Sequence, residues 1–146
     1  MIWMGLDVGD ATVGVAVSDG MGMLAHPVET IRRTSVKETV ARIIDLVVER
    51  EVERVVVGLP MNMNGTLGPQ GEKTQAFAKQ LEKKLKYSDK LKGKSIPIEF
   101  WDERLTSKAA DRTLIEADMR RDKRKQVIDQ LAAVYILQGY LDRHRG

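Results

Sequence analysis

Residues 2–19, IWMGLDVGDATVGVAVSD, contain the pattern that decides the fold: two short strand-forming runs joined by a Gly-Asp turn. Side-chain alternation along the first run places its apolar residues on one face and Asp7 on the other, together with Gly5 and Gly9. An ionised carboxylate is costly to bury without a partner, so Asp7 predicts a metal ion, a polar substrate or a hydrogen-bond donor on that face. The alternative is that Asp7 caps the turn between the two strands.

The rest of the chain alternates between strand and helix patterns. A capping-box spacing begins at Ser35, and apolar residues then recur at helical period as far as Arg50. Pro97 places the last strand at a sheet edge. The expected strands are 2–8, 12–19, 23–31, 54–59 and 96–101, and the expected helices are 36–50, one around 77–85, 106–117 and 123–143. Antiparallel strands at the front followed by crossover helices indicate an α/β fold, with a mixed sheet and helices on both faces.

Composition narrows the class of protein. A chain of 146 residues forms one domain, 1–146, large enough to fold without disulfides or structural metals. It has no Cys and no apolar stretch as long as a membrane span, so we expect a cytoplasmic protein that does not enter a membrane. The net charge is only +3, but basic residues cluster at 83–94 and 120–125. Such clusters attract phosphate backbones, although a solvated surface explains many of them equally well.

Two further acidic positions accompany Asp7. Asp102 and Glu103 follow the last strand, and strand parity sends their side chains to opposite faces, so only one of them is expected to join Asp7. Asp129 lies on a helical face that also carries Ala132 and Ala133, and that small face can approach the sheet closely. The simpler alternatives are a helix cap partnered by Arg104 for the acidic pair, and an ordinary ion pair within its own helix for Asp129.

Carboxylates converging from the first strand, the end of the last strand and the last helix would form an all-oxygen site suited to Mg²⁺ or Mn²⁺. Because like charges repel, such a site needs its cations. Two ions ~3.5–4 Å apart could activate a water and stabilise the leaving oxygen of a phosphodiester. The acids therefore point to phosphoryl chemistry.

Four blocks of sequence, spread over nearly the whole chain, carry a family resemblance. They are GLDVG with GVAVSD (5–9 and 14–19), VGLP with NMNGT (57–60 and 62–66), DERLT (102–106), and DQLAA with ILQ (129–133 and 136–138). In this order they closely resemble the YqgF/RuvX family of Holliday-junction resolvases. The resemblance implies a ribonuclease-H-like fold with sheet order 3-2-1-4-5. It also implies a metal-dependent nuclease acting on branched DNA or maturing the 5′ end of 16S ribosomal RNA, with Asp7, Glu103 and Asp129 at the acidic positions.

Candidate nucleic-acid contacts lie in the Gly-rich loop 62–71 and in the basic segments. The loop glycines allow close backbone approach to a phosphate, although an Asn-Gly dipeptide often only forms a turn. Family members commonly carry a basic residue in the turn occupied here by Asp10, Ala11 and Thr12. A phosphate contact near the metal site is therefore expected either to be weaker in this chain or to come from Arg104. The predicted contact residues are Asn62, Asn64, Gly65, Arg104, Arg120, Arg121, Lys123 and Arg124. Trp101 could stack on an unpaired base, but an aromatic residue at a strand end more often packs in the core.

Two rival functions are consistent with the same residues. The segment 7–12 resembles the phosphate-binding hairpin of actin and sugar-kinase folds, but those enzymes use two such domains and this chain has one copy. A non-catalytic nucleic-acid-binding module would depend on the basic clusters alone, with steep salt dependence and no cleavage. If the substrate is a junction cut in matched strands, a homodimer presenting two sites is expected, although no segment of the sequence indicates a dimer interface.

Overall fold

The structure, a computed structural model, describes residues 1–105 and 121–144, with the backbone alone over 121–130. Its centre is a five-stranded sheet in the order β3-β2-β1-β4-β5, as predicted. The central strand pairs antiparallel with β2 and parallel with β4, and β4 pairs parallel with β5. The strands are β1 (Trp3–Val8), β2 (Thr12–Ser18), β3 (Ala25–Arg32), β4 (Arg54–Leu59) and β5 (Ile98–Asp102).

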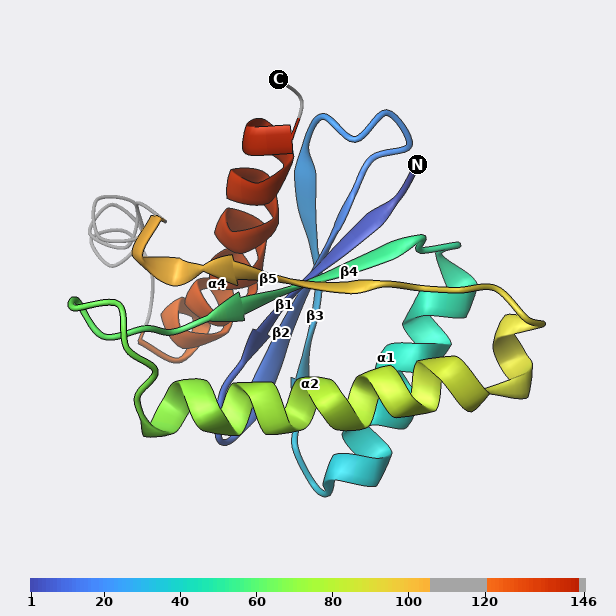
Figure 1. Ribbon diagram of the computed structural model, residues 1–146. Coiled ribbons are helices and arrows are strands. Elements are labelled where there is room, and N and C mark those ends of the chain that lie inside the picture. The colour runs from blue at the N-terminus through green and yellow to red at the C-terminus, as the bar shows by residue number, and fades with distance from the viewer. Residues whose placement is uncertain (106–120, 145–146) are drawn as a thin grey trace.

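Helices cover both faces of the sheet (Figure 1). They are α1 (Val36–Glu49), α2 (Pro69–Tyr87) and α4 (Arg121–His144), with short 3-10 turns η1 (Asp89–Leu91) and η2 (Glu103–Leu105). The predicted cap of α1 is confirmed, because the Ser35 hydroxyl accepts a hydrogen bond from the Glu38 amide. The predicted helix 106–117 lies outside the described residues. None of the helices in the described ranges has the length and apolar composition required to cross a bilayer.

The alternation predicted for β1 divides the core into two layers. Met4, Leu6 and Val8 are buried in the layer under α1 and α2. The opposite layer lies under α4 and contains Ala133, Ile136 and Leu137 of that helix, Ala16 and Val56 of the sheet, and the aromatic residues Trp101 and Tyr140. Alternation places Asp7 on this second face. Asp7 is half-buried there.

The approach of α4 to the sheet is close because β1 carries a glycine beneath it. A Cβ at Gly5 would lie 2.7 Å from the Leu137 Cβ and 2.9 Å from the Ala133 carbonyl oxygen. Farther along the helix, the Tyr140 hydroxyl donates to Glu99 of β5 at 2.5 Å and accepts from Arg54 of β4 at 2.9 Å. These contacts fix α4 across β1, β4 and β5.

The boundary between the polar loop and α2 differs from the sequence prediction for a local reason. Helix α2 begins at Pro69, because proline suits the first helical position and Gly68 precedes it in an extended conformation. The polar loop therefore ends at residue 68, and Gly71 lies inside the helix. A Cβ at Gly71 would be 2.7 Å from the Pro60 carbonyl oxygen, so this glycine accommodates the chain's own backbone and does not border an open phosphate site.

Candidate active site

Asp7 lies on the face of the sheet that α4 covers, and the neighbouring positions on both adjacent strands are glycines. It pairs with Gly14 of β2. Leu6 pairs with Val57, so the next position of the parallel ladder brings Gly58 of β4 beside Asp7. Backbone thus forms the floor around this carboxylate, which leaves room above it for other groups. The glycine-lined surface expected around Asp7 is present, and the polar partner expected there stays a prediction.

Glu103 comes to the same face from the end of β5. One of its carboxylate oxygens, Oε1, lies 3.1 Å from the position that a Cβ would take on Gly58. The Ile136 Cδ1 atom of α4 lies 2.4 Å from the same position. Gly58 of β4 is the neighbour of Asp7 on β1. The Glu103 carboxylate, which lies beside Gly58, is therefore on the same face of the sheet as the Asp7 carboxylate. Both residues make interactions, so neither is a free carboxylate.

Asp102 takes a different role. Its Oδ1 accepts the Arg104 backbone amide at 2.9 Å, and its two oxygens accept the Arg104 guanidinium at 2.6–3.1 Å. The hydrogen bonds from Arg104 hold the pKa of Asp102 below its usual value, and this carboxyl stays ionised. The alternative of a helix cap partnered by Arg104 therefore describes Asp102, whereas the Glu103 carboxylate lies beside Gly58.

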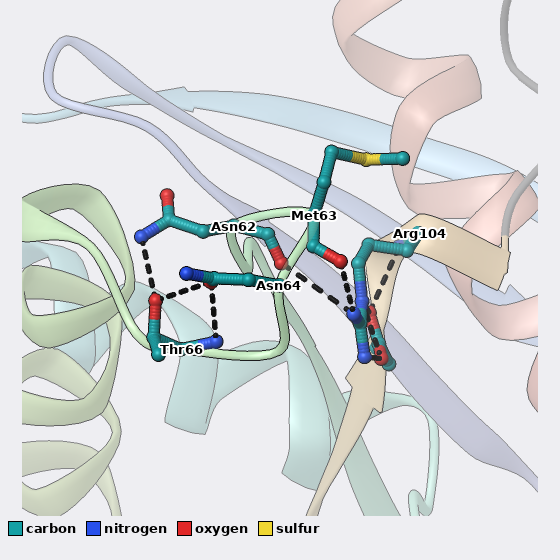
Figure 2. A network of polar contacts seen from close by, with 6 residues as sticks. Asn62, Met63, Asn64, Thr66 and Arg104 are labelled. Atoms are coloured by element: carbon teal, nitrogen blue, oxygen red, sulfur yellow. Dashed lines mark hydrogen bonds and ion pairs between the residues drawn. The ribbon is translucent and has the colours of Figure 1, made fainter.

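Arg104 also holds the loop that follows β4 (Figure 2). Its Nη1 donates to the carbonyl oxygens of Asn62 at 3.4 Å and Met63 at 3.3 Å. The guanidinium is thus shared between Asp102 and the loop backbone. The expected phosphate contact by Arg104 would have to compete with these bonds.

The side chains of Asn62 and Asn64 close the same loop on itself (Figure 2). Asn62 Nδ2 donates to the Thr66 hydroxyl at 3.0 Å, and Asn64 Oδ1 accepts the Thr66 amide at 3.1 Å. Gly65 has a positive φ of 85° and donates its amide to the Asn62 carbonyl at 2.9 Å, which is the Asn-Gly turn predicted as the simpler alternative. In this structure the two amides order the loop, and Met63 stands exposed at its tip.

The remaining predicted site residues are described in part or not at all. Asp129 belongs to α4, four residues before Ala133, and the structure describes only its backbone. The same holds for Arg121, Lys123 and Arg124, and Arg120 falls outside the described residues altogether. Their proposed roles remain predictions. Trp101 is buried and packs against Tyr140 with ring centroids 6.4 Å apart, which favours the core alternative for this residue.

Sequence reasoning missed two features near Asp7. Gly58 interrupts the valine run of β4, and a strand-interior glycine often marks a close approach by another group, which here is Glu103 with Ile136. Cations also gather at the turn after β1: Arg33 Nη1 donates to the Gly9 carbonyl at 2.6 Å, and Lys73 Nζ lies 3.5 Å from Asp10. Arg33 directly follows β3 and Lys73 belongs to α2, so only the tertiary structure brings these two cations to the turn.

The sheet order and the acid-bearing face define the ribonuclease-H-like class of folds. Thermus thermophilus RuvC, solved in complex with a Holliday junction substrate, shares this fold with a TM-score of 0.59 at 14% sequence identity. The comparison covers 99% of this chain and 96% of RuvC.

Within that class the chain belongs to the RuvX family. The family model, described as "Holliday junction resolvase", matches residues 1–143. A relative from Clostridioides difficile is 54% identical over 140 residues, covering 95% of this chain and 92% of the relative. A relative from Desulforamulus reducens is 50% identical over 139 residues and covers 95% of each chain. Both relatives carry the name "Putative pre-16S rRNA nuclease".

Proposed function

We propose that this protein is a metal-dependent nuclease of the cytoplasm that hydrolyses phosphodiester bonds in structured nucleic acid, with Asp7, Glu103 and Asp129 as its catalytic acids. The observation that carries the proposal is the position of the Glu103 carboxylate over Gly58, beside Asp7 and on the same face of the sheet. Membership of the RuvX family and the nuclease names of relatives about 50% identical support the same activity.

The donor set fits a hard divalent cation such as Mg²⁺ or Mn²⁺, because the candidate ligands are all carboxylate oxygens. Among residues with described side chains, no three His, Cys, Asp or Glu residues form a metal-binding group. A third ligand is therefore sought in α4. Helical periodicity puts residue 129 on the same side of the helix as Ala133, whose carbonyl oxygen meets Gly5. We assign Asp129 to this role.

Bound cations would supply an activated water and would stabilise charge on the leaving oxygen. The protein's own residues hold the acids for that chemistry. The β-ladders on both sides of Asp7 fix its backbone, and Ile136 and Trp101 close the α4 side with apolar surface. A low-dielectric wall beside the carboxylates strengthens their attraction for a cation. Asp102 stays outside this arrangement, since Arg104 neutralises it.

We propose precursor 16S rRNA as the substrate, on the strength of the names of the relatives about 50% identical to this chain. A four-way DNA junction is the second candidate, favoured by the description of the family model and by the fold shared with RuvC. Both substrates should be offered side by side, under the same metal and salt. If the junction is the preferred substrate, matched cleavage of two strands calls for a homodimer, which sedimentation would detect.

The test of the catalytic site compares Glu103 with its neighbour Asp102, which serves as the matched control. Asp7→Asn and Glu103→Gln should each lower the rate of Mg²⁺- or Mn²⁺-dependent cleavage by at least about 100-fold, because each removes a metal ligand's charge. Asp102→Asn removes a charge one residue from Glu103 but should keep cleavage within about tenfold of the unmodified protein. Rates would be measured in single turnover at saturating substrate.

Two results would contradict the assignment. Cleavage by Glu103→Gln at the unmodified rate, with Asp102→Asn inactive, would show that the other acid of the pair is the ligand. Metal-independent binding with no cleavage of either substrate, by any form of the protein, would favour the non-catalytic binding module.

A further inference from the structure

A long groove runs between α1 and α2 on the face of the sheet opposite α4. It consists of three adjoining hollows of about 600, 470 and 300 Å³. The first and second hollows share Val36 and Gln80 in their walls, and the second and third share Lys37, Val40 and Lys84. Because neighbouring hollows share walls, they form one continuous surface.

Basic residues outnumber acidic ones far more strongly in the groove than in the chain as a whole. Its walls contain five cations and one carboxylate: Arg33, Lys37, Lys73, Lys84, Lys90 and Asp10. The whole chain has 24 basic and 21 acidic residues, so an average patch would be nearly balanced. Such a concentration of one sign creates a potential that attracts polyanions. An acidic ligand is therefore favoured over a neutral one.

Intramolecular ion pairs do not explain all of these cations. Lys73 lies near Asp10 at 3.5 Å, and Lys90 pairs with Asp45 at 2.8 Å. Within the described part of the chain, the ammonium groups of Lys37 and Lys84 have no carboxylate within ion-pair distance. Lys37 also lies in the first turn of α1, where the helix dipole disfavours a positive charge. The stability of α1 therefore does not explain a lysine at position 37.

The groove opens at the end of the sheet that carries Asp7. Its first hollow is lined by Asp10 and Arg33, and Arg33 donates to the carbonyl of Gly9, two residues after Asp7. Along α2, Lys73 and Lys84 are separated by about 16 Å at 1.5 Å per residue. A nucleic-acid strand advances about 3.4 Å per phosphate in helical form, so this length spans roughly five phosphates.

We infer that this groove binds the sugar-phosphate backbone of a single nucleic-acid strand and leads it away from the catalytic acids, around the β1–β2 turn. The inference rests on the proposed nuclease function, which supplies the polyanionic substrate. Exposed Tyr87, near the far end of the groove, offers a ring on which a base can stack.

The test compares two double variants with equal change of charge. Lys37→Gln with Lys84→Gln removes two of the five cations of the groove, whereas Lys79→Gln with Lys83→Gln removes two cations from exposed positions of α2 that do not line it. Binding of a labelled single-stranded oligouridylate of about 12 nucleotides would be measured by anisotropy, in chelator to prevent cleavage, across a series of salt concentrations. Thermal melts would confirm that all forms are folded.

The groove variant should bind roughly twentyfold more weakly at about 0.1 M salt, and its log–log salt slope should fall by about 1.4, or 0.7 per lost phosphate contact. The control pair should change affinity less than threefold. Single-turnover cleavage at saturating substrate should stay unchanged in the control pair, because Lys79 and Lys83 line neither the groove nor the proposed active site. Equal weakening by the two pairs, or unchanged affinity in the groove pair, would overturn the inference. Binding is measured without metal, so a failure of the groove inference would not contradict the proposed nuclease activity. Conversely, if no cleavage were found, the binding measurements would still test the groove.

Discussion

Glycines give the proposed active site its shape. The sequence predicted that Asp7 would share a face with Gly5, because alternation along a strand is a local property. It also predicted that only one residue of the pair Asp102 and Glu103 would join Asp7. Which one does so depends on the register of β5 against β4, which no local pattern encodes. In the structure the Glu103 carboxylate lies beside Gly58, whose missing side chain leaves space for it, and this position favours Glu103.

Replacing Gly58 by alanine should therefore damage both the core and the site. The added methyl would meet the Ile136 Cδ1 at 2.4 Å and the Glu103 Oε1 at 3.1 Å. We expect Gly58→Ala to lower the free energy of unfolding by about 1–3 kcal/mol, as overpacking does, and to slow cleavage in protein that remains folded. Urea unfolding and single-turnover kinetics would measure the two effects. Gly20→Ala is the control, since nothing lies within 4 Å of a Cβ there; equal behaviour of the two variants would contradict the packing argument.

At the scale of elements, the loop between β4 and α2 depends on a distant arginine. Its turn was predictable, because an Asn-Gly pair favours a positive φ at the glycine. The role of Arg104 was not, because a basic residue beside two acids suggests a phosphate contact equally well. In the structure, Arg104 joins Asp102 of β5 to the backbone of residues 62 and 63. One side chain thereby connects this loop to the end of the strand that leads into Glu103.

Arg104→Lys should release the loop while keeping the charge. An ammonium lacks the planar fork that bonds Asp102 and the loop carbonyls together. We expect faster hydrogen exchange at the amides of Gly65 and Thr66, with exchange in the middle of α2, for example at Phe77, unchanged. Cleavage should fall modestly if the loop only orders the site. Identical exchange at Gly65 and Thr66 in both proteins would show that the loop holds its conformation without the arginine.

In our two proposals, the molecule separates catalysis and strand binding on the two faces of one sheet. The α4 face carries the acids, and the face under α1 and α2 carries the cationic groove. The sheet order was predictable from strand patterns together with the family resemblance. The groove was not predictable, because its cations come from the residue after β3, from α1, from α2 and from the turn after α2, and they meet only when the two helices pack side by side. Sequence clustering indicated a basic surface but not its shape.

Stability should fall at acidic pH because native carboxyls are held ionised. Hydrogen bonds from Arg42 lower the pKa of Glu29, and those from Arg104 lower the pKa of Asp102. A lowered native pKa contributes stability fully above the unfolded-state pKa of about 4, and this contribution disappears as the pH falls through the native value. The free energy of unfolding should thus decrease between about pH 5 and pH 3. Arg42 is 40% exposed, so its pair with Glu29 contributes less than about 1 kcal/mol.

Urea unfolding of the unmodified protein and of Glu29→Gln across this pH range would check the sign. The variant should be less stable at neutral pH, and its stability should vary less with pH. A variant whose pH dependence matched the unmodified protein would exclude Glu29 as a contributor.

The contact between Gly5 and α4 also sets an order of events during synthesis. Strand β1 leaves the ribosome more than a hundred residues before α4, which corresponds to roughly 6–25 s at about 5–20 residues per second. Until α4 arrives, the face that bears Asp7 lacks its cover and the helix that carries Asp129. On the proposed assignment of Asp7 and Asp129, a nascent chain has no complete catalytic centre, and we expect hydrolytic competence only when the first strand and the last helix of the fold meet.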